Sequence, residues 1–198
     1  MVDIFLESGV VLDSAFLKVV IIYGHIELAM YLMEGGHIEP DGHCFIQASG
    51  LGNLELVDYL LGRGIKVTSS SLERAVKYEN VAVVKRLLDI GVEVTDEVLL
   101  EACYSGNVEL LSCLLEVNFE SGEDFVALCF KRGNVECANI LLERGYAVTA
   151  DALREVVQLG DTYWVSRLLE KGAPITKEVI WSANSDSMLE LLSPRIVY

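Results

Sequence analysis

Glycines recur along the chain at a nearly constant spacing, and this repeat limits the possible folds more than any other feature. The column contains Gly9, Gly36, Gly64, Gly91, Gly145 and Gly172, and Asn118 stands where a further member is expected. Successive members lie 27 or 28 residues apart. A fixed spacing of roughly 20 to 50 residues is typical of solenoids and other repeat architectures. The chain is therefore predicted to be a repeat protein.

A second column has the same spacing and fixes the phase of the repeat. It consists of the pairs Gly24-His25, Gly52-Asn53, Glu79-Asn80, Gly106-Asn107, Gly133-Asn134 and Gly160-Asp161, and Ser187 continues it without a glycine. Apolar residues recur at helical spacing on both sides of each pair. In residues 95–118 these are Val98, Leu99, Ala102 and Cys103, then Val108, Leu111, Leu114 and Leu115. Each repeat is thus predicted to form a first helix, a turn and a second helix.

Residues suited to helix ends occupy the predicted boundaries. Side-chain acceptors that can cap a first helix are Asp13, Asp41, Thr68, Thr95, Thr149 and Thr176. Carboxylates are expected in the first turn of these helices at Glu97, Asp124, Asp151 and Glu178. Predicted caps of the second helices are Asn53, Asn80, Asn107, Asn134 and Asp161. The main glycine column is expected to end the second helices, where a left-handed backbone is needed.

The repeats resemble ankyrin repeats in two segments above all, EACYSGNVELLSCLLEVN (101–118) and QASGLGNLELVDYLLGRG (47–64). The resemblance extends from residue 9 to about residue 190 and departs from the family in two respects. The family period is about 33 residues, and its Thr-Pro-Leu-His opening is replaced here by Val98-Leu99-Leu100. The missing residues fall where ankyrins carry β-hairpin fingers. The resemblance implies an all-α, ankyrin-like helix-turn-helix solenoid of about six full repeats plus partial terminal repeats; tetratricopeptide repeats fit less well.

A single repeat domain is predicted over residues 1–198, because no linker-like stretch interrupts the pattern. Its repeats are residues 10–36, 37–64, 65–91, 92–118, 119–145, 146–172 and 173–198, and residues 1–9 form the tail of a partial N-terminal repeat. Pro194 interrupts the last second helix, so the stack is expected to end there.

Composition excludes several classes of function. The formal net charge of −15 argues against binding to a nucleic acid backbone. The longest dense apolar run, residues 16–23, contains Lys18 and is too short to span a membrane. The N-terminus has no basic start, so no signal peptide is expected. Five cysteines, an odd number without paired spacing, are interpreted as core residues in a reducing compartment. We expect a cytoplasmic protein, located in the host cytoplasm if the source is a pathogen or a virus.

The sequence contains one cluster of metal-ligating residue types and no catalytic motif. His37, Asp41, His43 and Cys44 lie close together in the one lengthened loop, but Asp41 is already assigned as a cap and no second ligand cluster exists. His25 occupies a cap column rather than a ligand position. No phosphate-binding loop or nucleophile motif interrupts the repeat. We therefore expect neither a metal, a cofactor nor catalysis.

Two positions of the first helix vary from repeat to repeat and lie away from its apolar stripe. The resemblance implies that first helices line a concave surface on which partners bind. The candidate contact residues for a protein partner are Ile22, Ile46, Lys77, Leu100, Tyr104, Lys131, Arg154 and Trp181. The competing interpretation is that these are tolerated surface side chains, with Trp181 packed as a lid at the chain's end. The predicted function is a non-catalytic scaffold that binds a protein.

The first repeat is unusually apolar at Phe16, Leu17, Val19, Ile21 and Ile22. Either residues 1–8 cover this surface or another chain does. Self-association through the first repeat, giving a structural protein, is therefore one alternative function. A second alternative comes from similarity to the ankyrin proteins of intracellular pathogens and large DNA viruses, which sequester host proteins.

Overall fold

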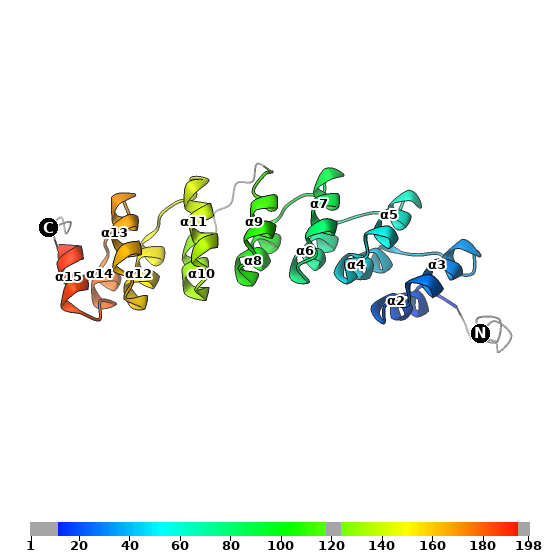
Figure 1. The fold of residues 1–198 in the computed structure, drawn as a ribbon, viewed down its shortest axis with the longest axis horizontal. Coiled ribbons are helices and arrows are strands. Elements are labelled where there is room, and N and C mark those ends of the chain that lie inside the picture. The colour runs from blue at the N-terminus through cyan, green and yellow to red at the C-terminus, as the bar shows by residue number, and fades with distance from the viewer. Residues whose placement is uncertain (1–11, 118–123, 194–198) are drawn as a thin grey trace. The chain divides into compact units, whose positions relative to one another are not determined.

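The computed structural model describes residues 12–117 and 124–193, and all the regular secondary structure in these ranges is helical. Gly9, Asn118 and Pro194 lie outside the described residues. The helices are α2 (Ser14–Ile22), α3 (Ile26–Glu34), α4 (Gly42–Leu51), α5 (Leu54–Gly62), α6 (Ser69–Lys77), α7 (Val81–Asp89), α8 (Asp96–Ser105), α9 (Val108–Leu114), α10 (Phe125–Arg132), α11 (Val135–Glu143), α12 (Ala150–Leu159), α13 (Thr162–Glu170), α14 (Lys177–Trp181) and α15 (Asp186–Leu192) (Figure 1). The predicted pair of helices in each repeat is thus confirmed.

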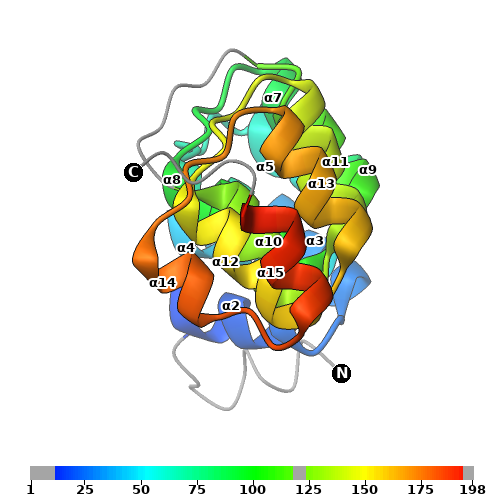
Figure 2. The same cartoon turned by 90° about the vertical axis from the view of Figure 1, so that its left-hand side faces the viewer.

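The helices form two compact units, Met1–Glu101 and Ala102–Tyr198, and the division falls within α8. We call them the N-terminal and C-terminal units. In the N-terminal unit the first helices α2, α4 and α6 pack side by side, and the second helices α5 and α7 do the same. In the C-terminal unit α12 packs between α10 and α14, while α13 contacts α15 (Figure 2). The single domain predicted from the sequence stays a prediction.

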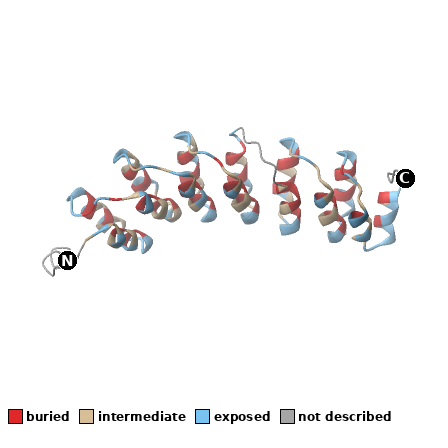
Figure 3. Ribbon diagram, turned by 180° about the vertical axis from the view of Figure 1, so that it is seen from behind, coloured by how far each residue is buried: buried red, intermediate tan, exposed pale blue. Residues whose placement is uncertain are grey.

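The core lies along the faces where the helices of each unit meet (Figure 3). The apolar stripes predicted from the sequence are buried there, including all five cysteines. One member of the stripes was assigned wrongly: Val108 is exposed, and Leu110 is buried in its place. Val108 is the first residue of α9, so its side chain precedes the packed part of that helix.

The turn between the two helices of a repeat needs a left-handed residue. Gly24, Gly52, Gly106, Gly133 and Gly160 adopt φ between 71° and 77° at this position. In the third repeat the position holds Glu79, which has φ 57° and is the one non-glycine residue with positive φ among those described. Because L-residues pay a steric cost in this conformation, Glu79 is a point of local strain.

Most predicted caps of the first helices form. Asp13, Asp41, Thr149 and Thr176 accept hydrogen bonds from the backbone N–H three residues ahead, as in the 2.9 Å bond between Asp41 Oδ1 and Cys44 N. Thr68 precedes α6 without forming a side-chain cap. Asp124 was expected inside the first turn, but it is itself the cap of α10 and accepts from Ala127 N at 2.9 Å. That helix begins two positions later in its repeat than α8 does.

Asparagines at the start of the second helices have two different roles. Asn53 and Asn107 cap their own helices, as predicted. Asn80 and Asn134 do not. Instead, Asn80 Nδ2 donates to the carbonyls of Ser49 and Gly50 in the preceding repeat, at 3.0 and 2.8 Å. Asn134 Nδ2 donates in the same way to Cys103 O at 2.7 Å and Tyr104 O at 3.3 Å. These two residues therefore connect successive repeats.

The preceding glycines make room for these asparagines. A Cβ added at Gly52 would lie 2.3 Å from Asn80 Oδ1, and one added at Gly106 would lie 2.5 Å from Asn134 Oδ1. At Gly24 a Cβ would meet no neighbouring atom within 4 Å. In every such repeat the turn glycine allows the left-handed backbone. At Gly52 and Gly106 its missing side chain also leaves room for the asparagine of the next repeat.

A basic residue just before the main glycine column links the ends of the second helices. Arg63 Nη2 donates to Met33 O at 2.6 Å, and Lys171 Nζ donates to Leu142 O at 3.5 Å. Arg144 Nη1 donates to Leu115 O. Each cation neutralises the C-terminal carbonyls of the second helix in the preceding repeat, where the helix dipole favours positive charge.

The last described repeat departs from the pattern. A turn was expected at Ser187, but this residue lies inside α15, which begins after its cap Ser185. Its first helix, α14, ends at Trp181. No glycine occupies the turn position to adopt a left-handed backbone. Ser185 instead caps α15 and Asp186 lies in its first turn, so the helix begins earlier than the repeat predicts. Within residues 12–117 and 124–193, no helix is both long and apolar enough to cross a membrane.

Candidate protein-binding surface

The eight candidate contact residues divide equally between the two units. In the N-terminal unit Ile22 is 54% exposed and Lys77 is exposed, whereas Ile46 and Leu100 are half-buried. In the C-terminal unit Tyr104 is 43% and Trp181 76% exposed, Lys131 is exposed, and Arg154 is half-buried. Each of the eight lies on a first helix, as predicted. The structure therefore leaves part of every one of these side chains open to solvent.

Trp181 does not pack as a lid. It is the last residue of the short helix α14, and its side chain is the most exposed of the large apolar side chains described. Packing against the described part of the chain thus fails to account for this tryptophan. A large aromatic side chain in water is a common anchor for a protein partner.

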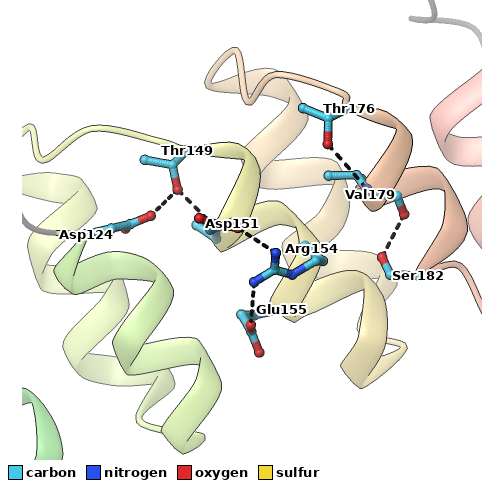
Figure 4. Close-up of polar contacts among 9 residues, drawn as sticks. Asp124, Thr149, Asp151, Arg154, Glu155, Thr176, Val179 and Ser182 are labelled. Carbon is cyan, nitrogen blue, oxygen red and sulfur yellow. Dashed lines mark hydrogen bonds and ion pairs between the residues drawn. The ribbon is translucent and has the colours of Figure 1, made fainter.

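Arg154 is held by acidic neighbours on its own helix (Figure 4). Its guanidinium lies 2.7 Å from Asp151 and 3.3 Å from Glu155. These pairs fix the side chain between α12 and α14, beside a pocket of about 270 Å³ that Thr176 and Glu178 also line. Because Asp151 and Glu155 already neutralise the charge of Arg154, this side chain would contact a partner through its shape and its hydrogen-bond donors more than through its charge.

Hydrogen bonds at the starts of two first helices stabilise the ionised form of a carboxylate. These carboxylates are Glu178 of α14, near Arg154, and Glu97 of α8. The Thr176 side chain, followed by the local backbone N–H, lowers the pKa of Glu178. The pKa of Glu97 is lowered by its own backbone N–H and then by Thr95. In the same region Thr149 Oγ1 donates to Asp124 Oδ2, joining two successive repeats (Figure 4). With their lowered pKa values, Glu97 and Glu178 stay ionised and help to keep the surface negative.

Tyr104 forms one side of a cation–π pair in the C-terminal unit. The guanidinium of Arg132 lies over its ring, 4.4 Å from the centroid. Both residues lie in the last turns of first helices, α8 and α10. The pair forms a flat, partly apolar surface that carries a positive charge.

A pocket of about 250 Å³ lies within the N-terminal unit, at the C-terminal ends of α2, α4 and α6. Its lining residues are Ile22, Gln47, Gly50, Leu51, Arg74 and Tyr78. Of these only Ile22 belongs to the candidate set, so sequence reasoning missed the rest. One signal was available, because the position one residue before each turn also varies: it reads Tyr23, Leu51, Tyr78, Ser105, Arg132 and Leu159.

The histidine and cysteine loop of the second repeat does not converge on a common point. His37 stacks on Tyr31 with ring centroids 6.1 Å apart, while His43 Nδ1 lies 4.0 Å from Asp41. Cys44 is buried, and this burial raises the pKa of its thiol to about 11. No group of three or more metal-ligating side chains that could hold an ion occurs in the described ranges.

Two further thiols, those of Cys129 and Cys137, are also held in the protonated form. Burial raises the pKa of Cys137 to about 11. The pKa of Cys129 is raised by its hydrogen bond with Cys103 and then by burial. Protonated, buried thiols react slowly as nucleophiles, so these cysteines act in packing.

The apolar surface predicted for the first repeat is only partly open. Leu17 and Ile21 are fully buried against neighbouring helices, and Phe16 is half-buried. Val19 and Ile22 remain exposed. Of the five residues over which a cover was expected, two therefore remain exposed, and both lie on one side of α2.

Comparison with known proteins identifies the repeat. Residues 72–152 match the family model described as ankyrin repeats, three copies. No curated protein matches the sequence. Among solved structures, the human ASB11 ankyrin repeat domain has a TM-score of 0.61 at 23% identity, covering 78% of this chain and 84% of that one. The ankyrin repeat domain of Bcl-3, described as a unique member of the IkappaB protein family, has a TM-score of 0.70 at 18% identity, covering 89% and 96%.

The matched segment and the structures agree with the two-helix repeats described above. The same pair of helices and the same left-handed turn occur before residue 72 and after residue 152. The short period leaves no β-strand within the described residues, where longer ankyrin repeats carry their fingers. Residues 72–152 therefore match ankyrin repeats in sequence, and the fold of the described residues is similar to that of ankyrin repeat domains.

Proposed function

We propose that the chain is a non-catalytic scaffold that binds a protein partner through the exposed side of its first helices. Ankyrin repeat domains generally mediate protein–protein interactions and are typically not catalytic. The observation that carries the proposal for this chain is the contrast between columns of the repeat. Columns that pack between helices keep small or apolar residues, whereas the two first-helix columns that contain Leu100 and Tyr104 have no consensus residue.

The exposed columns have the chemistry of a contact surface. They present Ile22, Tyr104 and Trp181 together with the cations Lys77 and Lys131. Aromatic and apolar side chains of this kind supply most of the binding free energy in protein interfaces. A surface kept only for solubility has no need to expose large apolar groups in water.

Site-specific photo-cross-linking tests this assignment. A benzophenone amino acid is placed at Ile22 in the N-terminal unit or at Tyr104 in the C-terminal unit, and the protein is irradiated in an extract of the cells that produce it. We expect a discrete cross-linked protein from one of these positions or from both. The same residue placed at Tyr31 or Tyr163 is the matched control.

The control positions carry equally exposed aromatic side chains on second helices. Tyr31 of α3 is 49% exposed and Tyr163 of α13 is 61% exposed. Equal cross-linking from second-helix and first-helix positions would remove the proposed face. Charged substitutions at Leu100 and Tyr104 provide a second test, because they should abolish partner capture while leaving helicity unchanged.

Self-association through α2 is a second candidate, supported by the exposure of Val19 and Ile22 on one side of that helix. Sedimentation velocity over a hundredfold range of concentration decides it. A concentration-dependent dimer that Val19→Glu dissociates would support self-association. A monomer at every concentration would exclude it.

A further inference from the structure

We propose that the pocket at the ends of α2, α4 and α6 binds a partner segment in which an aspartate or glutamate lies beside large apolar residues, with Arg74 pairing to that carboxylate. This inference rests on the proposed function and adds the chemistry of the bound segment. The pocket lies wholly within the N-terminal unit.

No described carboxylate lies within ion-pair distance of Arg74, and the same holds for Arg63, Arg132 and Arg144. Arg63 and Arg144, however, donate to carbonyls at the ends of second helices, which Arg74 does not. Arg86 pairs with Asp58 at 2.6 Å, and Arg154 and Arg167 also contact carboxylates. The guanidinium of Arg74 instead donates through Nη2 to Gln47 Oε1 at 3.1 Å and lies over the ring of Tyr78 at 4.8 Å. In a chain with 30 acidic and 15 basic residues, this cation is left without a counter-charge.

One donor of this guanidinium has no partner. Arg74 Nε is buried and makes no hydrogen bond. It lies against Gly50, where an added Cβ would be 3.0 Å from Nε and 2.9 Å from Cγ. Nε is shielded from the pocket by Gly50, so it is not itself the contact. Arg74 as a whole is half-buried and lines the pocket, and a charge-assisted hydrogen bond from its guanidinium to a carboxylate would gain strength in such a partly buried site.

The rest of the pocket lining is neutral. Ile22, Leu51 and Tyr78 all expose large apolar surface, and Gln47 and Gly50 add no charge. The lining as a whole therefore carries a single positive charge surrounded by apolar groups. An acidic residue flanked by leucine, isoleucine or phenylalanine complements it in charge and in hydrophobic surface. A nucleic acid does not, since the net charge of −15 repels a polyphosphate.

Peptide selection tests the proposal with a defined probe. A phage-displayed library of random 12-residue peptides is panned on the full chain, and enriched peptides are synthesised with a fluorophore. Their affinities are measured by fluorescence polarisation. We expect enriched peptides to carry Asp or Glu next to two large apolar residues. Arg74→Gln should weaken their binding roughly tenfold to hundredfold, which corresponds to the loss of one charge-assisted interaction.

Two further variants separate the pocket from general effects. Gly50→Ala places a methyl group 2.9 Å from Arg74 Cγ, so the Arg74 side chain must shift and peptide binding should weaken; thermal melting followed by circular dichroism checks that the variant is folded. Arg167→Gln is the matched control, because Arg167 also lies over an aromatic ring, Trp164, at 5.1 Å but on a second helix. It should bind the peptides as the wild type does.

A double-mutant cycle identifies the paired groups. Replacing the peptide's acidic residue by its amide should weaken binding to the wild type but not to Arg74→Gln. Enriched peptides that bind Arg74→Gln equally well would overturn the proposal, as would a basic consensus or no enrichment. A wild-type dimer abolished by Arg74→Gln would assign the pocket to a second copy and also overturn it. Cross-linking from Tyr104 would still support the proposed function in each of these cases.

Discussion

At the residue scale, Glu79 shows how a repeat tolerates a misfit. Five repeats place glycine at this turn position, and the third forces a glutamate into the same left-handed backbone. The turn persists because the helices on either side, α6 and α7, are packed by the neighbouring repeats. Strain of this kind is maintained by the surrounding structure and lowers overall stability.

Replacing Glu79 by glycine should stabilise the protein. Relief of the left-handed conformation gains about 1 to 2 kcal/mol, part of which is offset by the greater freedom of glycine in the unfolded chain. We expect a net gain of about 0.5 to 1 kcal/mol in the free energy of unfolding, measured by urea denaturation followed by circular dichroism. Glu79→Ala is the control, since it removes the side chain and keeps the strained backbone. An equal gain in both variants would place the effect in the side chain.

Asp41 links stability to pH. Burial tends to raise the pKa of its carboxyl group, but the hydrogen bond from Cys44 N–H and the nearby Lys18 outweigh burial and lower the pKa below its usual 3.8. A carboxyl group with a lowered pKa in the folded state stabilises the fold fully above the unfolded pKa. This contribution is lost as the pH falls from about 4 through the folded pKa.

Asp41→Ala should therefore cost about 1 kcal/mol at pH 7 through loss of the cap, and the cost should shrink below pH 4. Asp41→Asn keeps a capping oxygen without the charge, so its cost at pH 7 should be smaller. The measurement is the urea midpoint of the three proteins between pH 7 and pH 3. A cost for Asp41→Ala that stays constant over this range would show that ionisation of the cap does not matter.

At the scale of helices, the links between repeats are uneven. Arg63, Arg144 and Lys171 each place a cation over the C-terminal carbonyls of the preceding second helix. The corresponding position in the third repeat holds Ile90, which is exposed. The end of α5 therefore lacks the cation that the ends of α3, α9 and α11 receive.

Ile90→Arg should supply it. The new guanidinium would reach the carbonyl of Leu61, by analogy with Arg63 and Met33 one repeat earlier. A cation at a helix C-terminus stabilises by about 0.3 to 1 kcal/mol at low ionic strength. We expect a rise of that size in the free energy of unfolding at 20 mM salt and a smaller rise at 500 mM. Ile90→Gln, uncharged and of similar length, should give little of it, and a gain that is insensitive to salt would argue against the mechanism.

The helices were predictable from the sequence because the same first-helix and second-helix patterns recur in successive repeats. Glycine columns marked the turns, and buried stripes such as Leu99 and Ala102 were read correctly from their spacing. Prediction failed where one repeat departs from the others. The early start of α15 at Asp186 follows from a local cap that the column at Ser187 could not reveal.

The candidate surface was harder to predict for a physical reason. Spacing along a helix shows which side chains leave the apolar stripe, so the exposure of Ile22 and Tyr104 could be inferred. It does not show which residues of successive repeats meet. Arg74 contacts Gln47, 27 residues earlier in the preceding repeat, and Tyr78, four residues later. Both contacts depend on the space that Gly50 leaves beside the Arg74 side chain. Such contacts between repeats require coordinates.

At the scale of the whole molecule, the dominant property is charge. Acidic residues outnumber basic ones by two to one, giving a net charge of −15, and several of the basic groups are already committed to local pairs. Repulsion among the unpaired carboxylates opposes the folded state, because folding brings them closer together than in the unfolded chain. A net charge of this size favours solubility in a protein that exposes apolar residues on its first helices.

Screening this repulsion should stabilise the protein. Raising NaCl from 10 to 150 mM shortens the Debye length from about 30 Å to about 8 Å, so repulsion between distant carboxylates is lost while buried contacts are little affected. The thermal midpoint should rise by a few degrees, as measured by circular dichroism. The triple variant Glu34→Gln, Glu93→Gln and Glu170→Gln removes three exposed charges and should show a higher midpoint at 10 mM and a smaller rise with salt. A midpoint that falls with salt would mean that the surface ion pairs, such as that between Arg86 and Asp58, outweigh the net repulsion.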